Sequence, residues 1–267
     1  MLSGRWISTN SCLRCAMAVT DIETTRAMLE RLKMPIAGER LGDLLEESVR
    51  EKLAPHGLLD LLLKTEIDAR EEKRVSVNLK FSGLPPGMTL ESFDFAFQPS
   101  VDKNRIESLA TCEFIPRKEN LLLFGPPGVG KTHIAAGLGI KAIKNGFTVI
   151  FVTLDKLIER LKLDEENPQG ASGRRHRRTN LVIVDEVGYR PLTQAEANLF
   201  FGFVSKRYEN SSLIITSNKS VREWSSLFAS DEVLAAAVLD RLLHHAYAIS
   251  ISGRSYRLKD KEVMFKD

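Results

Sequence analysis

Near the middle of the chain stands Gly125-Pro126-Pro127-Gly128-Val129-Gly130-Lys131-Thr132, which matches the phosphate-binding pattern G-x-x-x-x-G-K-[ST]. The apolar run 121–124 before it predicts a buried strand, and residues 131–144 after it predict a helix. The glycines allow the backbone to curl so that several N–H groups and the helix N-terminus face one anion. Lys131 supplies a charge for the β- and γ-phosphates, and the Thr132 hydroxyl supplies a ligand for Mg²⁺. The weaker alternative is an ordinary Gly/Pro turn between a strand and a helix.

A second motif pairs with this loop. Residues 181–184 are apolar and predict a strand, which ends in Asp185 and Glu186. A parallel strand beside the phosphate loop would bring Asp185 to the Mg²⁺ shell. Glu186 would then stand where it can polarise a water for attack on the γ-phosphate. An ordinary strand with a solvated acidic end is the alternative, but the two motifs together predict that the chain binds ATP or a close relative, with Mg²⁺.

Composition sets the broad class. The chain has 267 residues, 43% hydrophobic and 27% charged, which is typical of a soluble globular protein. Its net charge of +3 is mildly basic and compatible with nucleic acid. The apolar run Val233–Leu239 is too short to span a bilayer, and residues 1–20 lack the apolar core of a signal peptide, so we expect no membrane association.

Cysteine usage indicates a reducing compartment, and we expect a cytoplasmic protein. The chain holds three cysteines, of which Cys12 and Cys15 form a C-x-x-C. Neither a second such pair nor a paired histidine accompanies it, so a zinc or redox role is the less favoured interpretation. Translation could start at Met1 or at Met17, and a start at Met17 would leave out residues 1–16, which include Cys12 and Cys15.

The chain divides into four predicted parts. Residues 1–20 are expected to be a disordered extension, and 261–267 a tail. Residues 21–82 carry three leucine-rich helical patterns, at 22–32, 41–53 and 58–67, and predict a small helical N-terminal domain. The breaker cluster Gly83–Gly87 marks its end. Residues 88–260 form the predicted core.

Strand and helix patterns alternate through this core. We expect strands at 121–124, 148–152, 181–184, 212–216 and 247–251, and helices at 131–144, 154–163, 193–208 and 231–243. Such alternation predicts an α/β fold with a parallel sheet and helices on both faces. Residues 165–173, rich in Gly, Pro and Ser, read as a loop.

Two further polar residues are candidates for the site. Asn218 follows the apolar strand 212–216, and there it could hold the attacking water or touch the γ-phosphate, or simply cap the next helix. Arg241 closes the helix 231–243. It is either an arginine finger that reaches a neighbouring subunit's γ-phosphate or a solvated cation at a helix end. His244 and His245 follow without a carboxylate or cysteine pattern, so we expect a packed or surface pair.

Taken together, these motifs resemble the IstB/DnaC-type AAA+ ATPases, a P-loop NTPase family. The similar stretches are residues 90–95, the loop from Gly125 to His133, residues 185–192, 214–218, 239–245 and 253–258, within a match from about residue 25 to 260. DE-x-GY-x-PL, DRLLHHA and G-x-SYRL are the stretches specific to the transposition-helper branch. The resemblance implies a small helical N-terminal domain, an AAA+ core and no C-terminal lid.

The resemblance also implies an activity and partners. The implied protein is a Mg²⁺-dependent ATPase that assembles as a homo-oligomer on double-stranded DNA and assists a transposase encoded nearby. It implies that Gly125 to His133 bind nucleotide and that Arg241 acts in trans as a catalytic residue with Lys131, Glu186 and Asn218. A DnaC-like replicative helicase loader and a nucleotide-gated scaffold that no longer hydrolyses ATP are the alternatives.

The chain departs from the family between the second and third strands. Relatives carry a longer helical stretch there, whereas this chain has a short loop and the cluster Arg174-Arg175-His176-Arg177-Arg178. Such a cluster could neutralise several DNA phosphates, although a charge run is more often a solvated face. The alternative DNA surfaces are the N-terminal helices and residues 254–257. The altered segment 164–180 leaves hydrolysis less firmly predicted than nucleotide binding.

Overall fold

The computed structural model describes residues 21–166, 179–228 and 230–259. They form two compact units that divide between Arg74 and Val75. The predicted division lies at residues 82–88, whereas this one falls inside the helix α4 (Pro55–Ser82), which runs past Arg74 without a break. Val75 and Leu79 on its second half pack against the core of the second unit. The predicted breaker cluster ends the helix instead, with Gly83 in the left-handed region at φ +76°.

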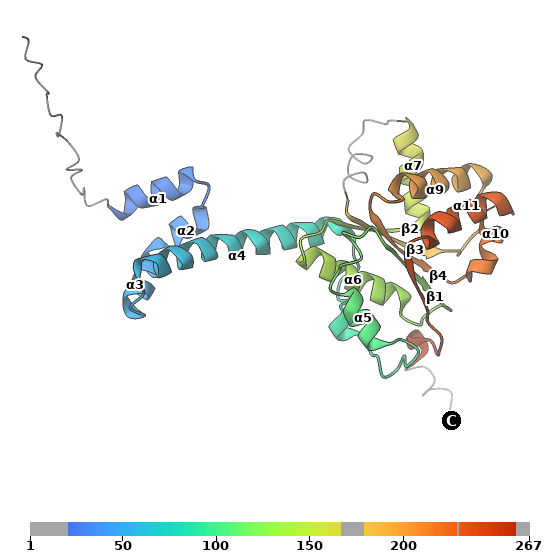
Figure 1. Cartoon of the computed structure of the whole chain (residues 1–267), viewed down its shortest axis with the longest axis horizontal. Coiled ribbons are helices and arrows are strands. Elements are labelled where there is room, and N and C mark those ends of the chain that lie inside the picture. The colour runs from blue at the N-terminus through green and yellow to red at the C-terminus, as the bar shows by residue number, and fades with distance from the viewer. Residues whose placement is uncertain (1–20, 167–178, 229, 260–267) are drawn as a thin grey trace, which may run out of the picture. The chain divides into compact units, whose positions relative to one another are not determined.

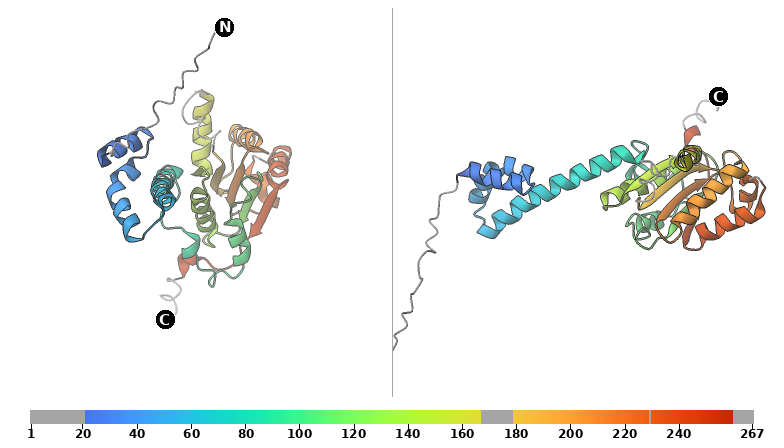
Figure 2. Two further views of the ribbon diagram at one scale, coloured as in Figure 1. Left: turned by 60° about the vertical axis from the view of Figure 1, so that its left-hand side comes forward. Right: turned by 90° about the horizontal axis from the view of Figure 1, so that it is seen from above.

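The first unit is helical, as predicted. It contains α1 (Ile22–Arg31), α2 (Pro35–Glu39), α3 (Leu41–Arg50) and the first part of α4, against which the three shorter helices lie (Figure 2). Its core is small and consists of Leu29, Ala37, Leu41, Leu44 and Leu62. The buried Glu66 on α4 accepts hydrogen bonds from the Ala37 N–H at 3.0 Å and from Arg70 Nε at 2.9 Å. A charged group therefore joins α2 to α4 where the apolar core is thin.

The second unit is built on a five-stranded sheet. Its strands are β1 (Asn120–Phe124), β2 (Val149–Thr153), β3 (Leu181–Val187), β4 (Ser212–Ser217) and β5 (Ala246–Ser250). They lie in the order β2-β3-β4-β1-β5, and every neighbouring pair is parallel. All five predicted strands are confirmed. The central position of β1 and β4 places the carboxyl ends of β3, β4 and β1 side by side, where parallel α/β sheets bind ligands.

Helices cover both faces of the sheet, as predicted (Figure 1). Leu121 and Leu123 of β1 pack on one face with α5 (Lys103–Leu109) and α6 (Lys131–Lys144). Leu122 and Phe124 pack on the other, with α7 (Leu154–Glu166), α9 (Gln194–Arg207), α10 (Trp224–Leu227) and α11 (Glu232–Leu243). This alternation follows from the two-residue period of a strand. It fixes the phosphate loop between the centre of the sheet and α6.

Some elements were not predicted. α5, α10 and the short 3₁₀ helices at Leu90–Ser92, Val221–Glu223 and Tyr256–Leu258 are additions, and α7 continues to Glu166, into the predicted loop. Cys12, Cys15, Met17, the Arg174–Arg178 cluster and the tail 261–267 lie outside the described residues, so the predictions made for them stay predictions. Within the described ranges, no helix has both the length and the apolar character needed to cross a membrane.

Candidate functional site

The phosphate loop follows β1 and leads directly into α6. Gly128 and Gly130 adopt left-handed backbone conformations, with φ +84° and +97°, which disfavour any residue with a Cβ atom. Space is also short, because a Cβ atom on Gly130 would stand 2.5 Å from Cε2 of Phe93. Lys131 and Thr132 then form the first turn of α6. The loop glycines are therefore required by shape, as the motif predicted.

A cavity of about 220 Å³ opens at this loop. Its walls come from the loop, from the ends of β3 and β4, and from the segments around residues 88–98 and 256–257. The lining residues are Met88, Ser92, Phe93, Asp94, Gln98, Pro127, Gly128, Val129, Gly130, Lys131, Thr132, His133, Asp185, Glu186, Tyr189, Thr216, Asn218, Tyr256 and Arg257. The structure thus brings all the predicted site residues to one cavity except Gly125 and Pro126, which lie in the same loop, and Arg241.

Lys131 points its amino group into the curl of the loop. Its Nζ donates to the carbonyl oxygens of Gly125, at 2.7 Å, and Pro126, at 2.8 Å, and the residue is only 9% exposed. Burial lowers the pKa of Lys131, the Asp185 carboxylate acts in the opposite direction, and the charge of Arg257 lowers it again. A buried cation at the N-terminus of α6 is a strong electrostatic site for an anion such as a phosphate.

Thr132, Asp185 and Thr216 form a hydrogen-bonded set. The Thr132 hydroxyl donates to Asp185, with Oγ1–Oδ1 and Oγ1–Oδ2 distances of 3.0 and 3.1 Å. The Thr216 hydroxyl on β4 donates to the same carboxylate in a short contact. Asp185 is 5% exposed and Thr216 is buried. Hydroxyl and carboxylate oxygens are the ligand types that Mg²⁺ prefers, so this set fits that ion.

An irregularity in β3 turns two neighbouring acids toward one cavity. Successive side chains on a regular strand point to opposite faces of the sheet. Here the pairing of β3 with β4 shifts register between Val184 and Val187, and Glu186 adopts a left-handed conformation with φ +62°. Its N–H donates to the Thr216 hydroxyl at 3.1 Å. The bulge thereby lets Asp185, buried, and Glu186, exposed, line the same cavity.

Asn218 and His133 complete the predicted set. Asn218 stands just after β4, and its Oδ1 is buried without a hydrogen-bond partner among the described residues. A buried unpartnered amide oxygen in a cavity wall is costly unless a ligand or water satisfies it. The His133 ring Nε2 contacts the Thr89 carbonyl oxygen at 2.8 Å and the Ser92 hydroxyl at 3.1 Å. His133 therefore ties the segment before β1 to α6.

Arg241 does not join this cavity. In the described chain its Nη1 donates to the Ala237 carbonyl oxygen at 2.9 Å, and the guanidinium lies over the Phe201 ring, 4.7 Å from its centroid. These contacts hold the side chain along α11 and α9 rather than toward the phosphate loop. The finger role, which needs a second subunit, stays a prediction.

Several lining residues were not predicted as site residues. Phe93 and Tyr256 supply aromatic walls, and Arg257 supplies a second cation close to Lys131. Gln98 is 2% exposed, and its Nε2 donates to the Arg254 carbonyl oxygen at 2.8 Å. That bond orients the amide, and its Oε1 is buried without a partner among the described residues. The only sequence signal was that residues 90–95 and 253–258 belonged to the similar stretches.

Comparison with known proteins identifies one family and several relatives to which this chain is similar. A family model described as IstB-like ATP binding protein matches residues 27–263. A relative from Pseudomonas aeruginosa, named as an ATP-binding protein of insertion sequence IS21, is 43% identical over 88% of this chain and 88% of its own length. A second, from Geobacillus stearothermophilus and named for insertion sequence IS5376, is 39% identical over 87% and 93%.

Solved structures show the same fold at lower identity. The crystal structure of the DnaC helicase loader superposes with a TM-score of 0.52 at 24% identity and covers 62% of this chain and 97% of that one. The crystal structure of DnaI superposes at 0.51 with 23% identity, over 63% and 95%. With the parallel sheet and the phosphate loop, these matches confirm the predicted P-loop AAA+ fold class.

Proposed function

The chain belongs to the IstB-like ATP-binding protein family, and from this premise we propose that it is an ATP-hydrolysing helper of DNA transposition. The carrying observation is the bulge in β3, which turns Asp185 and Glu186 together into the cavity of the phosphate loop. A protein that only binds nucleotide has no need of a second carboxylate held there in a strained conformation. The proposal therefore includes hydrolysis as well as binding.

ATP is the substrate that these residues fit. The loop N–H groups and Lys131 would bind its β- and γ-phosphates. Thr132 and Asp185 would hold Mg²⁺, which neutralises charge on the same phosphates when bound. The unpartnered Oδ1 of Asn218 would accept a hydrogen bond from the attacking water. Glu186, whose side chain is exposed to the cavity, would take the proton from that water.

Transposition is supported by the relatives. Those at 43%, 39% and 38% identity all carry the names of insertion-sequence ATP-binding proteins. The family resemblance then suggests that the chain assembles as a homo-oligomer on double-stranded DNA and recruits a transposase encoded nearby. Arg241, which lies outside its own chain's cavity, is proposed to complete a neighbouring subunit's site. The helicase-loader alternative has only the fold in its favour, because the loader structures are below 25% identical.

A phosphate-release assay tests the hydrolysis. The full chain is incubated with ATP and Mg²⁺, with and without duplex DNA, beside Glu186→Gln. We expect turnover that DNA stimulates, and a loss of about 10²–10⁴-fold in Glu186→Gln, the usual contribution of a general base. Glu186→Gln should still bind a fluorescent ATP analogue. Tight binding with no turnover in the wild-type chain would instead assign the scaffold role.

A further inference from the structure

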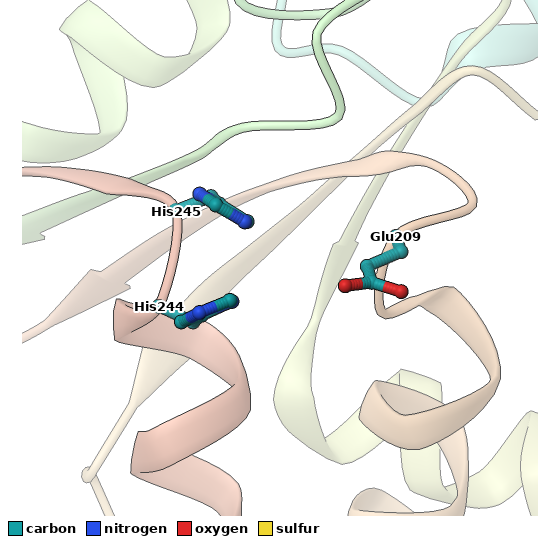
Figure 3. Close-up of side chains that lie close together, drawn as sticks. All are labelled: Glu209, His244 and His245. Carbon is teal, nitrogen blue, oxygen red and sulfur yellow. The ribbon is translucent and has the colours of Figure 1, made fainter.

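Three metal-binding side chains meet outside the nucleotide cavity. Glu209, His244 and His245 each offer one ligand atom, and these atoms all lie within 4.8 Å of one another. Figure 3 shows the two imidazoles and the carboxylate turned toward the same space from two different elements. The histidine pair alone carried no metal signal in the sequence, because no carboxylate or cysteine spacing typical of a metal site accompanies it. The fold supplies that carboxylate from a position 35 residues earlier (244 − 209).

Local backbone geometry produces this convergence. Glu209 stands just after the end of α9 and adopts a left-handed conformation, with φ +58°. His244 caps the end of α11, and His245 directly precedes β5. The imidazole rings lie 4.0 Å apart between centroids. A glutamate in a strained backbone conformation that faces two closely spaced, tilted histidine rings is an arrangement that the chain holds at a cost, and such strain is concentrated at functional sites.

Neighbouring groups suit a cation. The Tyr208 hydroxyl lies 2.9 Å from Nδ1 of His244. The other ring nitrogen, Nε2, is then the one left to bind an ion. A hydrogen bond on one ring nitrogen orients the ring and tunes the other, as is usual for metal-binding histidines. The C-terminal end of α11 also carries the negative end of the helix dipole. The weaker interpretation is a surface Tyr–His hydrogen bond without an ion.

We propose that Glu209, His244 and His245 form a zinc site. Two imidazoles and one carboxylate are a known three-ligand set for Zn²⁺, which leaves a fourth position to water or to an incoming group. Zinc–ligand bonds of about 2.0–2.2 Å require the ligand atoms to move closer together. All three side chains are exposed and can rotate to do so. The bound ion would join the end of α9 to the end of α11, the helix that carries Arg241.

Zinc titration of the full chain tests the site. The measurement uses competition with a chromophoric chelator, in a background of Cys12→Ser and Cys15→Ser, because those thiols are zinc ligands in their own right. We expect one Zn²⁺ per chain. His244→Ala, His245→Ala and Glu209→Gln should each weaken the affinity more than tenfold. His56→Ala, which removes an exposed histidine on α4, is the matched control and should leave it unchanged.

Two additional readouts separate ligation from a structural effect. Co²⁺ in place of Zn²⁺ should give the intense visible absorption of a tetrahedral ion, and Glu209→Gln should change that spectrum. Tyr208→Phe should weaken binding less than the loss of any ligand, since the hydroxyl is not a ligand and only positions His244 and Glu209. Circular dichroism confirms that each variant is folded. Zinc affinity that survives in the Glu209/His244/His245 triple variant, or no bound zinc in the parent, would overturn the proposal.

Discussion

The nucleotide cavity and the end of α11 are built in opposite ways. In the cavity, Lys131, Asp185 and Thr216 are buried and hydrogen-bonded to one another or to the loop. At the end of α11, Arg241 is half-buried and His244 is exposed, and their hydrogen bonds go to neighbouring residues on the surface. The first region is organised within a single chain, whereas Arg241 makes its described contacts with α11 and α9 and none with the nucleotide cavity of its own chain.

This difference predicts how each region contributes to ATP binding and hydrolysis. A preorganised cavity can bind its ligand without rearrangement, which favours affinity and rate. In the proposed finger role, the half-buried Arg241 would act only when a neighbouring subunit approaches. We therefore expect variants of the cavity to lose ATP binding in isolated subunits, and variants of Arg241 to lose hydrolysis only in assemblies.

The largest effect should come from Arg241→Ala. An arginine finger contributes about 10³–10⁵-fold to the hydrolysis rate. The variant should lose DNA-stimulated phosphate release by a factor in this range, yet bind a fluorescent ATP analogue like the wild type. Mixing Arg241→Ala with Lys131→Ala should restore part of the activity, because some interfaces then combine an intact finger with an intact loop. Normal assembly without such rescue would contradict a role in trans.

Lys131→Ala should reduce binding in every assembly state. The substitution removes the buried cation from the loop, so affinity for a fluorescent ATP analogue should fall more than tenfold, which corresponds to more than about 1.4 kcal/mol. Lys144→Ala, at the far end of α6, is the matched control and should bind as the wild type does. An affinity for Lys131→Ala within about threefold of the wild type would contradict the conclusion that the cavity of a single chain binds the phosphates through Lys131.

Thr216→Val tests the buried support of the two acids. The exchange keeps the shape but removes the hydroxyl that bonds Asp185 and the Glu186 N–H. A lost hydrogen bond costs about 0.5–1.5 kcal/mol, so the Mg²⁺ concentration needed for half-maximal hydrolysis should rise by about two- to tenfold. A fall in rate that saturating Mg²⁺ does not recover would show that Thr216 acts mainly through Glu186.

The smallest effect on activity should come from acid, through Glu196. Its hydrogen bonds and ion pairs with Arg190 and Lys162 hold the segment after β3, and they lower the pKa of Glu196 to about 2 against the opposing effect of burial. Because the folded pKa is depressed, this stabilisation is present above pH 4.5 and is lost as the pH falls toward 2.

Urea unfolding of wild type and Glu196→Gln as a function of pH checks this expectation. Glu196→Gln should lower the free energy of unfolding by about 1–3 kcal/mol at neutral pH. The difference in unfolding free energy between the variant and the wild type should disappear in strong acid. ATP hydrolysis at pH 7 should change less than twofold. A difference in unfolding free energy that does not change with pH would show that the variant is destabilised by altered packing rather than by the lost charge.

Much of the cavity could be predicted from the sequence because its parts are local. The loop, the strand that ends in Asp185 and Glu186, and the position of Asn218 each follow from a short pattern whose period or spacing carries the information. Gln98 and Arg257 could not be predicted in this way, since they reach the cavity from segments about 160 residues apart (257 − 98 = 159) without any regular spacing.

The same limit applies to Glu209 and the histidines, and to the division of the chain. Glu209, just after α9, and the two histidines, just after α11, meet only because the sheet brings both helices to one face. The breaker cluster Gly83–Gly87 predicts a division after α4, but Val75 and Leu79 on that helix already pack in the core of the second unit. In each case a tertiary contact overrides what a local pattern indicates.

The left-handed backbone of Glu186 sets a stability–activity trade-off at one position. A non-glycine residue in that region costs about 1–2 kcal/mol, a strain from which glycine is exempt. Glu186→Gly is therefore expected to leave the fold as stable as the parent, or more so, while it removes the proposed base. Selection for folding stability alone would tend to replace Glu186. Degenerate copies of such a gene could thus persist as well-folded proteins that bind nucleotide without hydrolysing it.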